Sequence, residues 1–372
     1  MEETFNEANT NTNQEEIKCS SCGAFLHYAI GTTKLQCQYC GGENEIETEE
    51  VEIVENDFLA FIREQESHET TVSITTVQCD GCGANSQLDK HLTASECPFC
   101  ATPLVVKNGQ KGNFIAPQYL LPFKIERKKA EEEFVKWVKS LWFAPNDLLK
   151  NAKHTMEKFN GVYMPYWTYD ADTVTHYTGQ RGDHYYVTVS YKDSEGKTQT
   201  RQERRTRWSF TSGIVHVNFD DVLVCASKAL PDDMTRSLEP WDLHELTSYK
   251  DEYLSGFKSE CYQISAEEGF EVGKSVMADK IHSAICRQIG GDEQRVSSKK
   301  TQYNDIKFKY ILLPLWISAF KYQQKPYRFT VNARTGEVHG TRPYSAIKIA
   351  LAVIAGLAII GAIIYYFNTH QA

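Results

Sequence analysis

The chain has 372 residues, of which 24% are charged, and it carries a formal net charge of −9 at pH 7. This length accommodates two or three domains, and a mean hydropathy of −0.46 is largely that of a soluble protein. The negative charge disfavours nucleic acid or anionic lipid headgroups as the main binding partners.

The N-terminal part of the chain contains two cysteine quartets with the same spacing. Residues 1–17, rich in Asn, Thr and Glu, precede them and are expected to form a disordered tail. Each quartet has the form Cys-x2-Cys-x14-Cys-x2-Cys, and each member of the second follows its counterpart by 60 residues, which identifies an internal duplication. The eight cysteines are Cys19, Cys22, Cys37, Cys40, Cys79, Cys82, Cys97 and Cys100.

This spacing predicts two closed metal sites. Each Cys-x2-Cys pair forms a tight knuckle that directs two thiolates at one point, and two knuckles make a tetrahedral cage suited to Zn²⁺. We expect two zinc ions per chain, which would bring the net charge to about −13 with eight thiolates. A rubredoxin-like iron site is the alternative, since Cys97-Pro98-Phe99-Cys100 suits either metal. Disulfides are disfavoured, because the chain is large and has no signal peptide.

Other residues near and beyond the quartets support a structural role for the cysteines. Gly23, Gly41 and Gly83 follow knuckle cysteines, where backbone freedom lets N–H groups reach the sulfurs. Four thiolates leave no open coordination position, so we expect no chemistry at the metals. Three further cysteines are expected to be small core residues rather than ligands or nucleophiles: Cys225, Cys261 and Cys286.

An acidic linker separates the quartets. Residues 43–69 contain eleven acidic residues and one basic residue, Arg63. Apolar residues within it predict a short strand or helix rather than pure linker: Val51, Ile53, Phe58, Leu59, Phe61 and Ile62.

The region after residue 123 combines helices with strands. Apolar residues at helical spacing predict a helix from Arg127 that ends at Pro145, a short helix near 146–158, and a long helix over 265–289. Alternating sequences rich in Tyr, Val and Thr predict strands over 162–227 and again over 306–340. Turns are expected at 193–196 and 332–336. The fold class is therefore α+β, with antiparallel strands.

A weak internal echo occurs within this region. Tyr163-Met164-Pro165-Tyr166-Trp167 resembles Leu312-Leu313-Pro314-Leu315-Trp316 after a shift of 149 residues. Two related halves would explain the echo. Chance recurrence of an edge-strand proline beside aromatic residues explains it equally well.

The segment from Ile349 to Phe367 contains 19 residues without a charge. As a helix it spans about 28 Å, which is enough for a bilayer core, and a buried helix of a soluble protein is the alternative. Tyr365 and Tyr366 lie where an aromatic belt is expected. Arg342 and Lys348 precede the segment and no Lys or Arg follows it, so we expect a single-pass, tail-anchored protein of the cell membrane with its N-terminal part in the cytoplasm.

Two stretches resemble chemical motifs. Gly269–Ser275 is close to a P-loop, but three residues separate its glycines where four are needed, and it lies within the predicted helix. Polar residues from Asp170 to His184 are consistent with an acid–base or metal site, but alternation on the solvent faces of a sheet explains them better. They are Asp170, Asp172, His176, Arg181, Asp183 and His184. Without a recognisable nucleophile or zinc-protease motif, we expect no enzyme.

One basic cluster stands out in this acidic chain. It consists of Lys197, Arg201, Arg204, Arg205 and Arg207, with Trp208 adjacent. On a hairpin it would contact lipid phosphates, an acidic partner or the acidic linker, and a solvated strand face is the default interpretation. The ribbons are not basic, since residues 77–104 hold Asp80, Asp89 and Glu96 against Lys90, which lowers the expectation of nucleic-acid binding.

Several motifs scattered over residues 18–345 carry a family resemblance. They are the doubled CxxCGA knuckles at Cys19–Ala24 and Cys79–Ala84, together with Leu121–Lys124, Gly161–Trp167 and Phe219–Val224. Through them the chain resembles the bacterial double zinc-ribbon membrane proteins of YdjG type, often labelled "TFIIB-type zinc ribbon" or "primosomal protein N′-like helicase". The helicase label finds no support, because the sequence has neither a Walker A motif nor a DEAD-like box. The resemblance implies an association with PspA-type membrane-stress proteins.

These features predict a zinc-ribbon adaptor or scaffold, fixed in the lipid bilayer, that binds a protein partner at the cytoplasmic membrane face. Membrane-associated nucleic-acid binding through the ribbons is the alternative, and an enzyme using residues 170–184 is a weaker one. The expected segments are a tail (1–17), ribbon 1 (18–43), the acidic linker (44–76), ribbon 2 (77–104), a connector (105–123), an α+β domain (124–345), a transmembrane helix (346–367) and a short tail (368–372).

Overall fold

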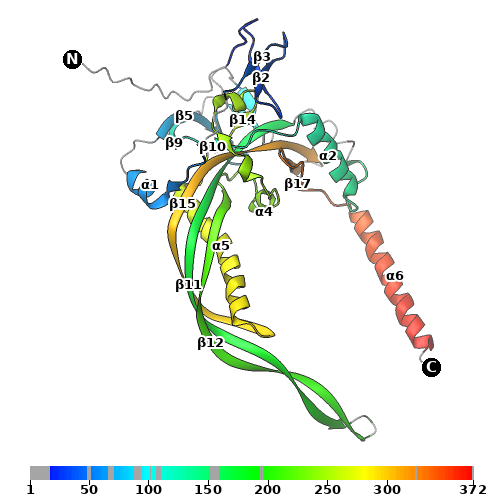
Figure 1. Ribbon diagram of the computed structural model, residues 1–372. Coiled ribbons are helices and arrows are strands. Elements are labelled where there is room, and N and C mark those ends of the chain that lie inside the picture. Colours follow the sequence, from blue (N-terminus) through cyan, green and yellow to red (C-terminus); the bar gives the residue numbers. More distant parts are fainter. Residues whose placement is uncertain are drawn as a thin grey trace.

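The computed structural model describes residues 17–370, apart from 48–51, 66–70, 88–93, 101, 106–109, 149, 151–158, 193, 195 and 323–324 (Figure 1). Within these residues, small β-sheets carry the two cysteine quartets at one end of the molecule, a long curved sheet forms the centre, and an apolar helix projects from the side of the body. The predicted α+β fold class is confirmed. The N-terminal tail lies outside the described residues except for Ile17.

Ribbon 1 is a three-stranded antiparallel sheet. Its strands are β1 (Leu26–Ala29), β2 (Lys34–Cys37) and β3 (Glu43–Glu45), in that spatial order. Leu26 and Leu35 are buried between the sheet and the body of the molecule. A unit of this size buries too little apolar surface to be stable alone, so its contacts with the body matter for its stability.

The acidic linker contains the predicted short elements. Strand β4 (Asn56–Asp57) pairs with the central sheet, and helix α1 (Phe58–Gln65) follows it directly. The strands around ribbon 2 extend beyond its predicted bounds of 77–104, since the first begins in the linker and the last lies in the predicted connector. They are β5 (Thr71–Gln78), β6 (Asn85–Gln87), β7 (Ala94–Glu96), β8 (Pro103–Val105) and β9 (Gln110–Ile115). They form one sheet in the order β6-β5-β9 and a separate β7-β8 pair.

The central sheet is built on three very long strands, β11 (Asn160–Lys192), β12 (Thr198–Cys225) and β15 (Glu293–Tyr322). Its order is β12-β11-β15-β10-β13, where β10 is Tyr119–Leu120 and β13 is Thr247–Ser248. Strand β16 (Lys325–Asn332) pairs with β15, β17 (Val338–Gly340) pairs with β16, and β14 (Lys258–Ser259) pairs with β11. The turn expected at 332–336 lies between β16 and β17.

Strand β15 begins 13 residues before the start that the sequence predicts. Its first part, from Glu293 to Asp305, is mostly polar, and it lies at a stretch of sheet with extensive solvent contact. Period-2 alternation of apolar residues is therefore weak there, although the backbone pairs continuously with β11.

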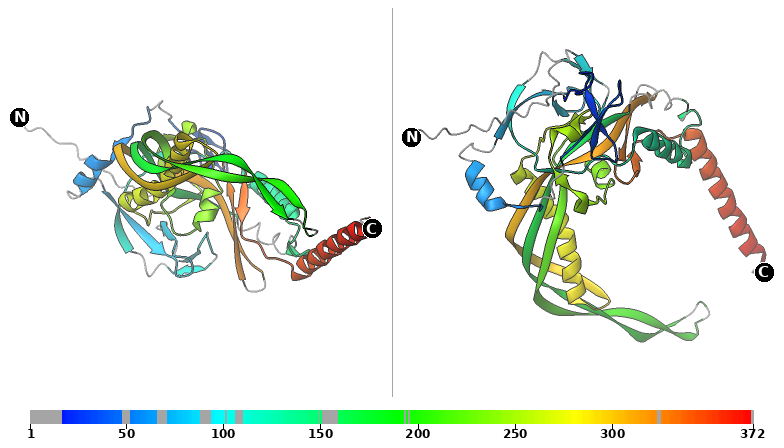
Figure 2. Two further views of the ribbon diagram at one scale, coloured as in Figure 1. Left: turned by 90° about the horizontal axis from the view of Figure 1, so that it is seen from below. Right: turned by 45° about the horizontal axis from the view of Figure 1, so that its top comes forward.

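Beyond the Gly182↔Glu293 pair, β11 and β12 continue without β15 as a two-stranded hairpin, which we call the arm (residues 183–207). The arm leaves the body as a free ribbon in Figure 1 and in the right view of Figure 2. Its strands pair as far as Lys192↔Thr198, and half of the turn expected at 193–196 lies outside the described residues.

Two helices pack beside the sheet. Helix α2 (Arg127–Ser140) ends five residues before the predicted Pro145, and most of the helix expected at 146–158 lies outside the described residues. Helix α5 (Ala266–Ile289) begins at a capping box in which the Ser265 hydroxyl accepts from the Glu268 N–H and the Glu268 carboxylate accepts from the Ser265 N–H. Short helical turns join the remaining segments: α4 (Asp232–Arg236), η2 (Leu243–Glu245) and η3 (Asp251–Leu254).

The near-P-loop is a close-packing motif of α5. A Cβ atom on Gly269 would lie 2.5 Å from the Tyr169 Oη and 2.8 Å from Cδ1 of Trp167. Tyr169 also donates a 2.6 Å hydrogen bond to the Ala266 carbonyl. The glycine therefore lets the helix approach β11 closely, and the motif lies inside a helix as predicted.

The two echo motifs pair with each other. In the antiparallel β11–β15 ladder Tyr163 lies opposite Pro314, and Pro165 lies opposite Leu312. Both strands lie inside the sheet, so the edge-strand explanation of the two prolines is wrong. Each proline carbonyl accepts from the residue just after a neighbouring strand: Pro165 from Ala226 at 2.9 Å, and Pro314 from Ala333 at 3.2 Å.

The surrounding strands repeat this relationship. Strand β14 runs parallel to β11 at Val162 and Tyr163, and β10 runs parallel to β15 at Ile311 and Leu312, which are the positions 149 residues later. Residues 119–226 and 258–333 thus form equivalent units about an axis between β11 and β15. Each unit gives its short first strand to the long strand of the other. We call this arrangement the strand exchange.

Candidate metal centres

The structure brings each predicted quartet together. The four Sγ atoms of each set lie within 4.8 Å of one another, and the closest pairs are 3.4 to 3.6 Å apart. A tetrahedron with Zn–S bonds of about 2.3 Å has sulfur–sulfur edges of about 3.8 Å. A disulfide needs a sulfur–sulfur distance of about 2.05 Å, so the cysteines are free thiols with the spacing of a metal cage.

The protonation behaviour of the thiols also fits a dication. Backbone N–H groups of Ser21 and Cys22 lower the pKa of Cys19 to about 6, as expected at a knuckle. In contrast, the adjacent Cys97 sulfur and burial raise the pKa of Cys82, because crowded thiolates repel one another. Bound Zn²⁺ would remove this conflict by stabilising all four thiolates together. The two quartets are therefore compatible with two zinc ions.

Glycine supplies the knuckle geometry, as the sequence indicates. Gly23, Gly41 and Gly83 have φ of 73°, 74° and 77°, in the left-handed region that other residues rarely adopt. The Gly23 N–H donates to the Cys19 carbonyl and the Gly83 N–H donates to the Cys79 carbonyl, each at 2.8 Å. The duplicated sequence thus builds the same turn in both ribbons.

The two cages differ in their exposure to solvent. In ribbon 1, Cys22 and Cys40 are exposed while Cys19 and Cys37 are buried. In ribbon 2, three cysteines are buried and Cys82 is partly buried. The cysteine spacing alone does not predict this difference in exposure, because it arises from how each ribbon packs on the body.

Both ribbons dock on one strap of the body, residues 255–263. Ribbon 1 donates from the Tyr28 N–H to the Ser255 carbonyl at 3.0 Å, and the Ser255 hydroxyl donates to the Leu26 carbonyl at 2.5 Å. In ribbon 2, the Asn85 carbonyl accepts a hydrogen bond from the Cys261 N–H at 3.0 Å. The ribbons are therefore fixed to the α+β body rather than hanging from a free linker.

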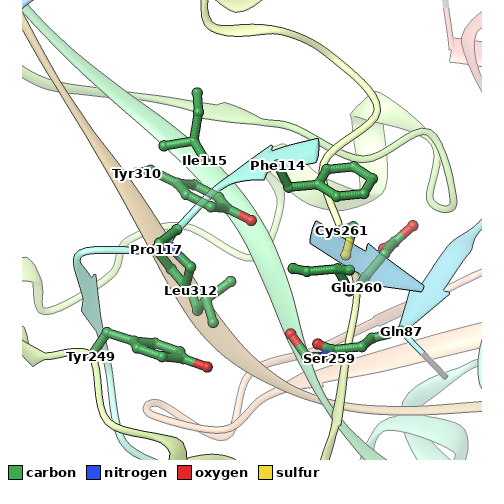
Figure 3. Close-up of a pocket in the computed structure, with 12 residues that line it drawn as sticks. Gln87, Phe114, Ile115, Pro117, Tyr249, Ser259, Glu260, Cys261, Tyr310 and Leu312 are labelled. Carbon is green, nitrogen blue, oxygen red and sulfur yellow. The ribbon is translucent and has the colours of Figure 1, made fainter. Parts of the chain in front are cut away.

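A buried carboxyl group lies at the ribbon 2 junction. Glu260 accepts from the Asn85 N–H at 3.2 Å, and burial raises the pKa of Glu260 to about 8. Figure 3 shows it beside Cys261 and Ser259 at a cavity of about 30 Å³, which has room for one or two water molecules. Burial raises the pKa of Cys261 and of Cys225 to about 12, so both remain neutral thiols at pH 7.

The polar residues from Asp170 to His184 do not form one site. They are distributed along a single strand: Asp172 accepts from Asn218, Arg181 pairs with Asp183 at 2.9 Å, and His184 lies 2.7 Å from Glu293. At about 3.3 Å per residue, roughly 45 Å of strand separates the two ends of this stretch. The structure therefore supplies no catalytic cluster from these residues.

One of them belongs to a different group, which sequence reasoning missed. Carboxylate oxygens of Glu55, Asp170 and Asp220 lie within 4.8 Å of one another. The Lys309 amine lies 2.9 Å from Glu55 and 2.7 Å from Asp221, so a buried cation already compensates this group. Burial and the Glu55 carboxyl raise the pKa of Asp170 to about 7. No sequence signal connects Glu55 to residues more than a hundred positions later.

The basic cluster lies in the arm, with Lys197 just before β12 and the four arginines on it, away from the acidic linker. Arg207 lies over the Tyr185 ring at 5.2 Å and Arg201 over the Tyr191 ring at 5.6 Å. Glu55 of the linker pairs instead with Lys307 and Lys309 of β15. The ion pairs that Glu55 makes are therefore with the central sheet and not with the basic cluster.

Helix α6 (Ala346–His370) contains the predicted membrane segment. Residues 346–367 are long and apolar enough to cross a membrane, and no part of this span is buried inside the protein. The Ser345 N–H donates to the Phe143 carbonyl, and the Lys348 amine donates to the Ala144 carbonyl, both at 2.7 Å. The helix therefore starts at the end of α2 and carries an apolar surface that the protein itself does not cover.

The chain is similar to the uncharacterized protein YdjG of Bacillus subtilis (strain 168). The two are 26% identical over 345 residues, which are 92% of this chain and 93% of that protein. No protein-family model matches the chain, and no solved structure matches it. The similarity to YdjG extends over nearly the whole length of both proteins and, because that protein is uncharacterized, it transfers no activity.

Proposed function

We propose that this chain is a membrane-anchored zinc-ribbon adaptor of YdjG type, which faces the cytoplasm and holds a soluble protein partner at the membrane surface. Its two quartets would each hold one Zn²⁺ as a closed structural site. A partner from a PspA-type membrane-stress system is the specific candidate that the family resemblance suggests.

The position of the ribbons relative to α6 is the observation that carries this proposal. Both ribbons lie at one end of the body, and α6 leaves from its flank beside α2 and points away from ribbon 1 (Figure 1 and the right view of Figure 2). If α6 crosses the bilayer, the ribbons face away from it, where a soluble partner has access. Tyr39, in the second knuckle of ribbon 1, is 87% exposed and offers an aromatic contact to such a partner.

The charge of this region supports a protein partner over nucleic acid. The linker next to the ribbons is strongly acidic, and phosphate groups would be repelled there. The basic cluster lies on the arm, at the opposite side of the body from the ribbons (Figure 1).

In-cell photo-crosslinking tests the proposal without removing any folded segment. A photoreactive amino acid replaces Tyr39 on ribbon 1, and the matched control replaces Tyr186, which is exposed on the arm. We expect a defined protein adduct from position 39 in the membrane fraction and no such adduct from position 186. Adducts to DNA or RNA at position 39 would replace the adaptor proposal with the nucleic-acid alternative.

A further inference from the structure

An apolar groove lies between α1 and the first turns of α5. Its volume is about 610 Å³, within the range of sites that hold side chains or ligands. Its apolar lining consists of Phe58, Leu59, Ile62, Phe270, Tyr303 and Ile306.

The floor of the groove is rigid. Strand β4 fixes the start of α1 on β15 through the Asn56–Phe308 and Asp57–Lys307 pairs. The Phe58 ring then packs against Phe270 at 4.9 Å and Phe308 at 5.9 Å between centroids. A pre-formed floor lowers the entropy cost of binding.

One lip of the groove is an exposed leucine. Leu59 is 55% exposed on the outer side of α1, although the neighbouring Phe58 is buried in the core. A single exposed leucine is ordinary, but this one borders a cavity with five further apolar side chains. An apolar side chain entering the groove would cover Leu59 and Ile62 together.

The opposite rim is acidic. Glu267, Glu268 and Glu271 line the groove from the first turns of α5, together with one cation, Lys274. The Lys274 amine lies 2.6 Å from Glu271 and 4.8 Å from the Phe270 ring centroid, so its charge is directed to partners within the protein. The rim therefore has a net charge of −2 from these four residues, and Glu267 is exposed at its edge.

We propose that this groove binds an amphipathic helix of the protein partner, with an apolar side chain in the cavity and Lys or Arg residues against the acidic rim, chiefly Glu267. This inference rests on the proposed adaptor function and gives the chemistry of the partner. Helices that bind such grooves present apolar anchors at i, i+3/i+4 and i+7. The acidic rim disfavours fatty acids and phosphates, whose negative charge it would repel.

Two synthetic helical peptides with the same leucine positions test the groove. Lysine flanks the leucines in one peptide and glutamate flanks them in the other, and fluorescence anisotropy measures binding to the full-length chain in nanodiscs of zwitterionic lipid. We expect the lysine peptide to bind at least ten-fold more tightly than the glutamate peptide. Empty nanodiscs give the background.

Three variants locate the binding. Leu59→Glu should weaken binding of the lysine peptide at least ten-fold. Glu267→Lys should reduce the ratio by which the chain binds the lysine peptide more tightly than the glutamate peptide. Tyr186→Glu, an exposed aromatic change on the arm, should alter neither value. Equal binding of both peptides, or binding unaffected by Leu59→Glu, would overturn the proposal.

The groove and the adaptor function fail in different ways. If neither peptide binds the wild-type chain but the Tyr39 adduct is still formed, groove binding is refuted and the adaptor function is not. Absence of the adduct with specific peptide binding retained would refute partner contact at ribbon 1 while the groove remains a peptide-binding site.

Discussion

Trp167 and Trp316 occupy equivalent places and make equivalent hydrogen bonds. The Trp167 indole N–H donates to the Ile264 carbonyl at 2.9 Å, just before α5, and the Trp316 indole N–H donates to the Ile125 carbonyl at 2.7 Å, just before α2. Each tryptophan thus holds the helix start that belongs to the other unit of the strand exchange. The two bonds join the units in both directions.

Replacing either tryptophan should weaken the fold by a similar amount. Trp167→Phe or Trp316→Phe leaves a carbonyl without its donor in a largely buried site, at a cost of about 1–3 kcal/mol each. Urea unfolding of the chain in detergent, followed by far-UV circular dichroism, measures the loss. Phe210→Leu on the exposed face of the sheet is the control and should change stability little. A large cost at one tryptophan and none at the other would contradict their equivalence.

The two zinc ions should leave at different rates. Elemental analysis is expected to give two zinc ions per chain, and a chelator should remove the ribbon 1 ion first because Cys22 and Cys40 are exposed. A colorimetric zinc indicator follows the two phases. Cys22→Ser should abolish the fast phase, and Cys82→Ser the slow one. Iron with visible absorbance, or a single phase of one ion, would refute the two-zinc proposal.

Replacing Glu260 by glutamine should remove a pH dependence of stability that arises where ribbon 2 contacts the body. The folded-state pKa of Glu260 is raised to about 8 from an ordinary value of 4.5. The protonated Glu260 carboxyl therefore contributes fully to the free energy of unfolding below about pH 4.5. This contribution is lost as the pH rises toward and through 8, because the folded state then has to ionise a buried carboxyl group. Between pH 6 and pH 9 the wild type should lose about 2–3 kcal/mol relative to the glutamine variant.

Unfolding curves of both proteins at pH 6, 7, 8 and 9 measure this difference. The control variant Asp172→Asn changes an exposed carboxyl group, so its stability should vary with pH as that of the wild type does. Parallel pH profiles for wild type and Glu260→Gln would show that Glu260 has an ordinary pKa.

Gly269 should matter for packing and not for nucleotide binding. Gly269→Ala forces a Cβ atom against Tyr169 and should cost about 1–3 kcal/mol. Gly273→Ala meets its nearest neighbour at 3.4 Å and should cost much less. Neither these variants nor Lys274→Ala should change ATP binding, which calorimetry should find absent in the wild type.

Deletion of residues 346–372 should release a soluble protein from the membrane fraction, because α6 carries the apolar surface that the body leaves uncovered. With an epitope appended after Ala372, protease outside intact cells should remove the epitope and leave residues 1–340 intact. The opposite pattern would reverse the proposed orientation.

The sequence predicts what depends on local spacing. The quartets, the glycine turns and the long helix over 265–289 follow from patterns within short segments, and the structure contains all of them. It predicts less where distant segments meet. Glu55 lies 254 residues before its partner Lys309, and neither residue carries a motif. The groove likewise requires α1 and α5 to be adjacent, which only the folded β4–β15 pairing brings about.

The length of the arm was also beyond prediction, since a polar two-stranded ribbon has no buried face to impose alternation. The echo of Pro165 and Pro314, in contrast, was visible in the sequence. Its meaning depended on strand pairing, which places the two motifs against each other rather than in separate sheets.

The strand exchange has a consequence for synthesis of the chain on the ribosome. Trp167 emerges about 100 residues before Ile264, the acceptor that fixes its position. At about 5–20 residues per second, the first unit waits roughly 5–20 s with apolar strands uncovered. During that interval the nascent chain is exposed to aggregation, and it would benefit from a chaperone until its second unit arrives.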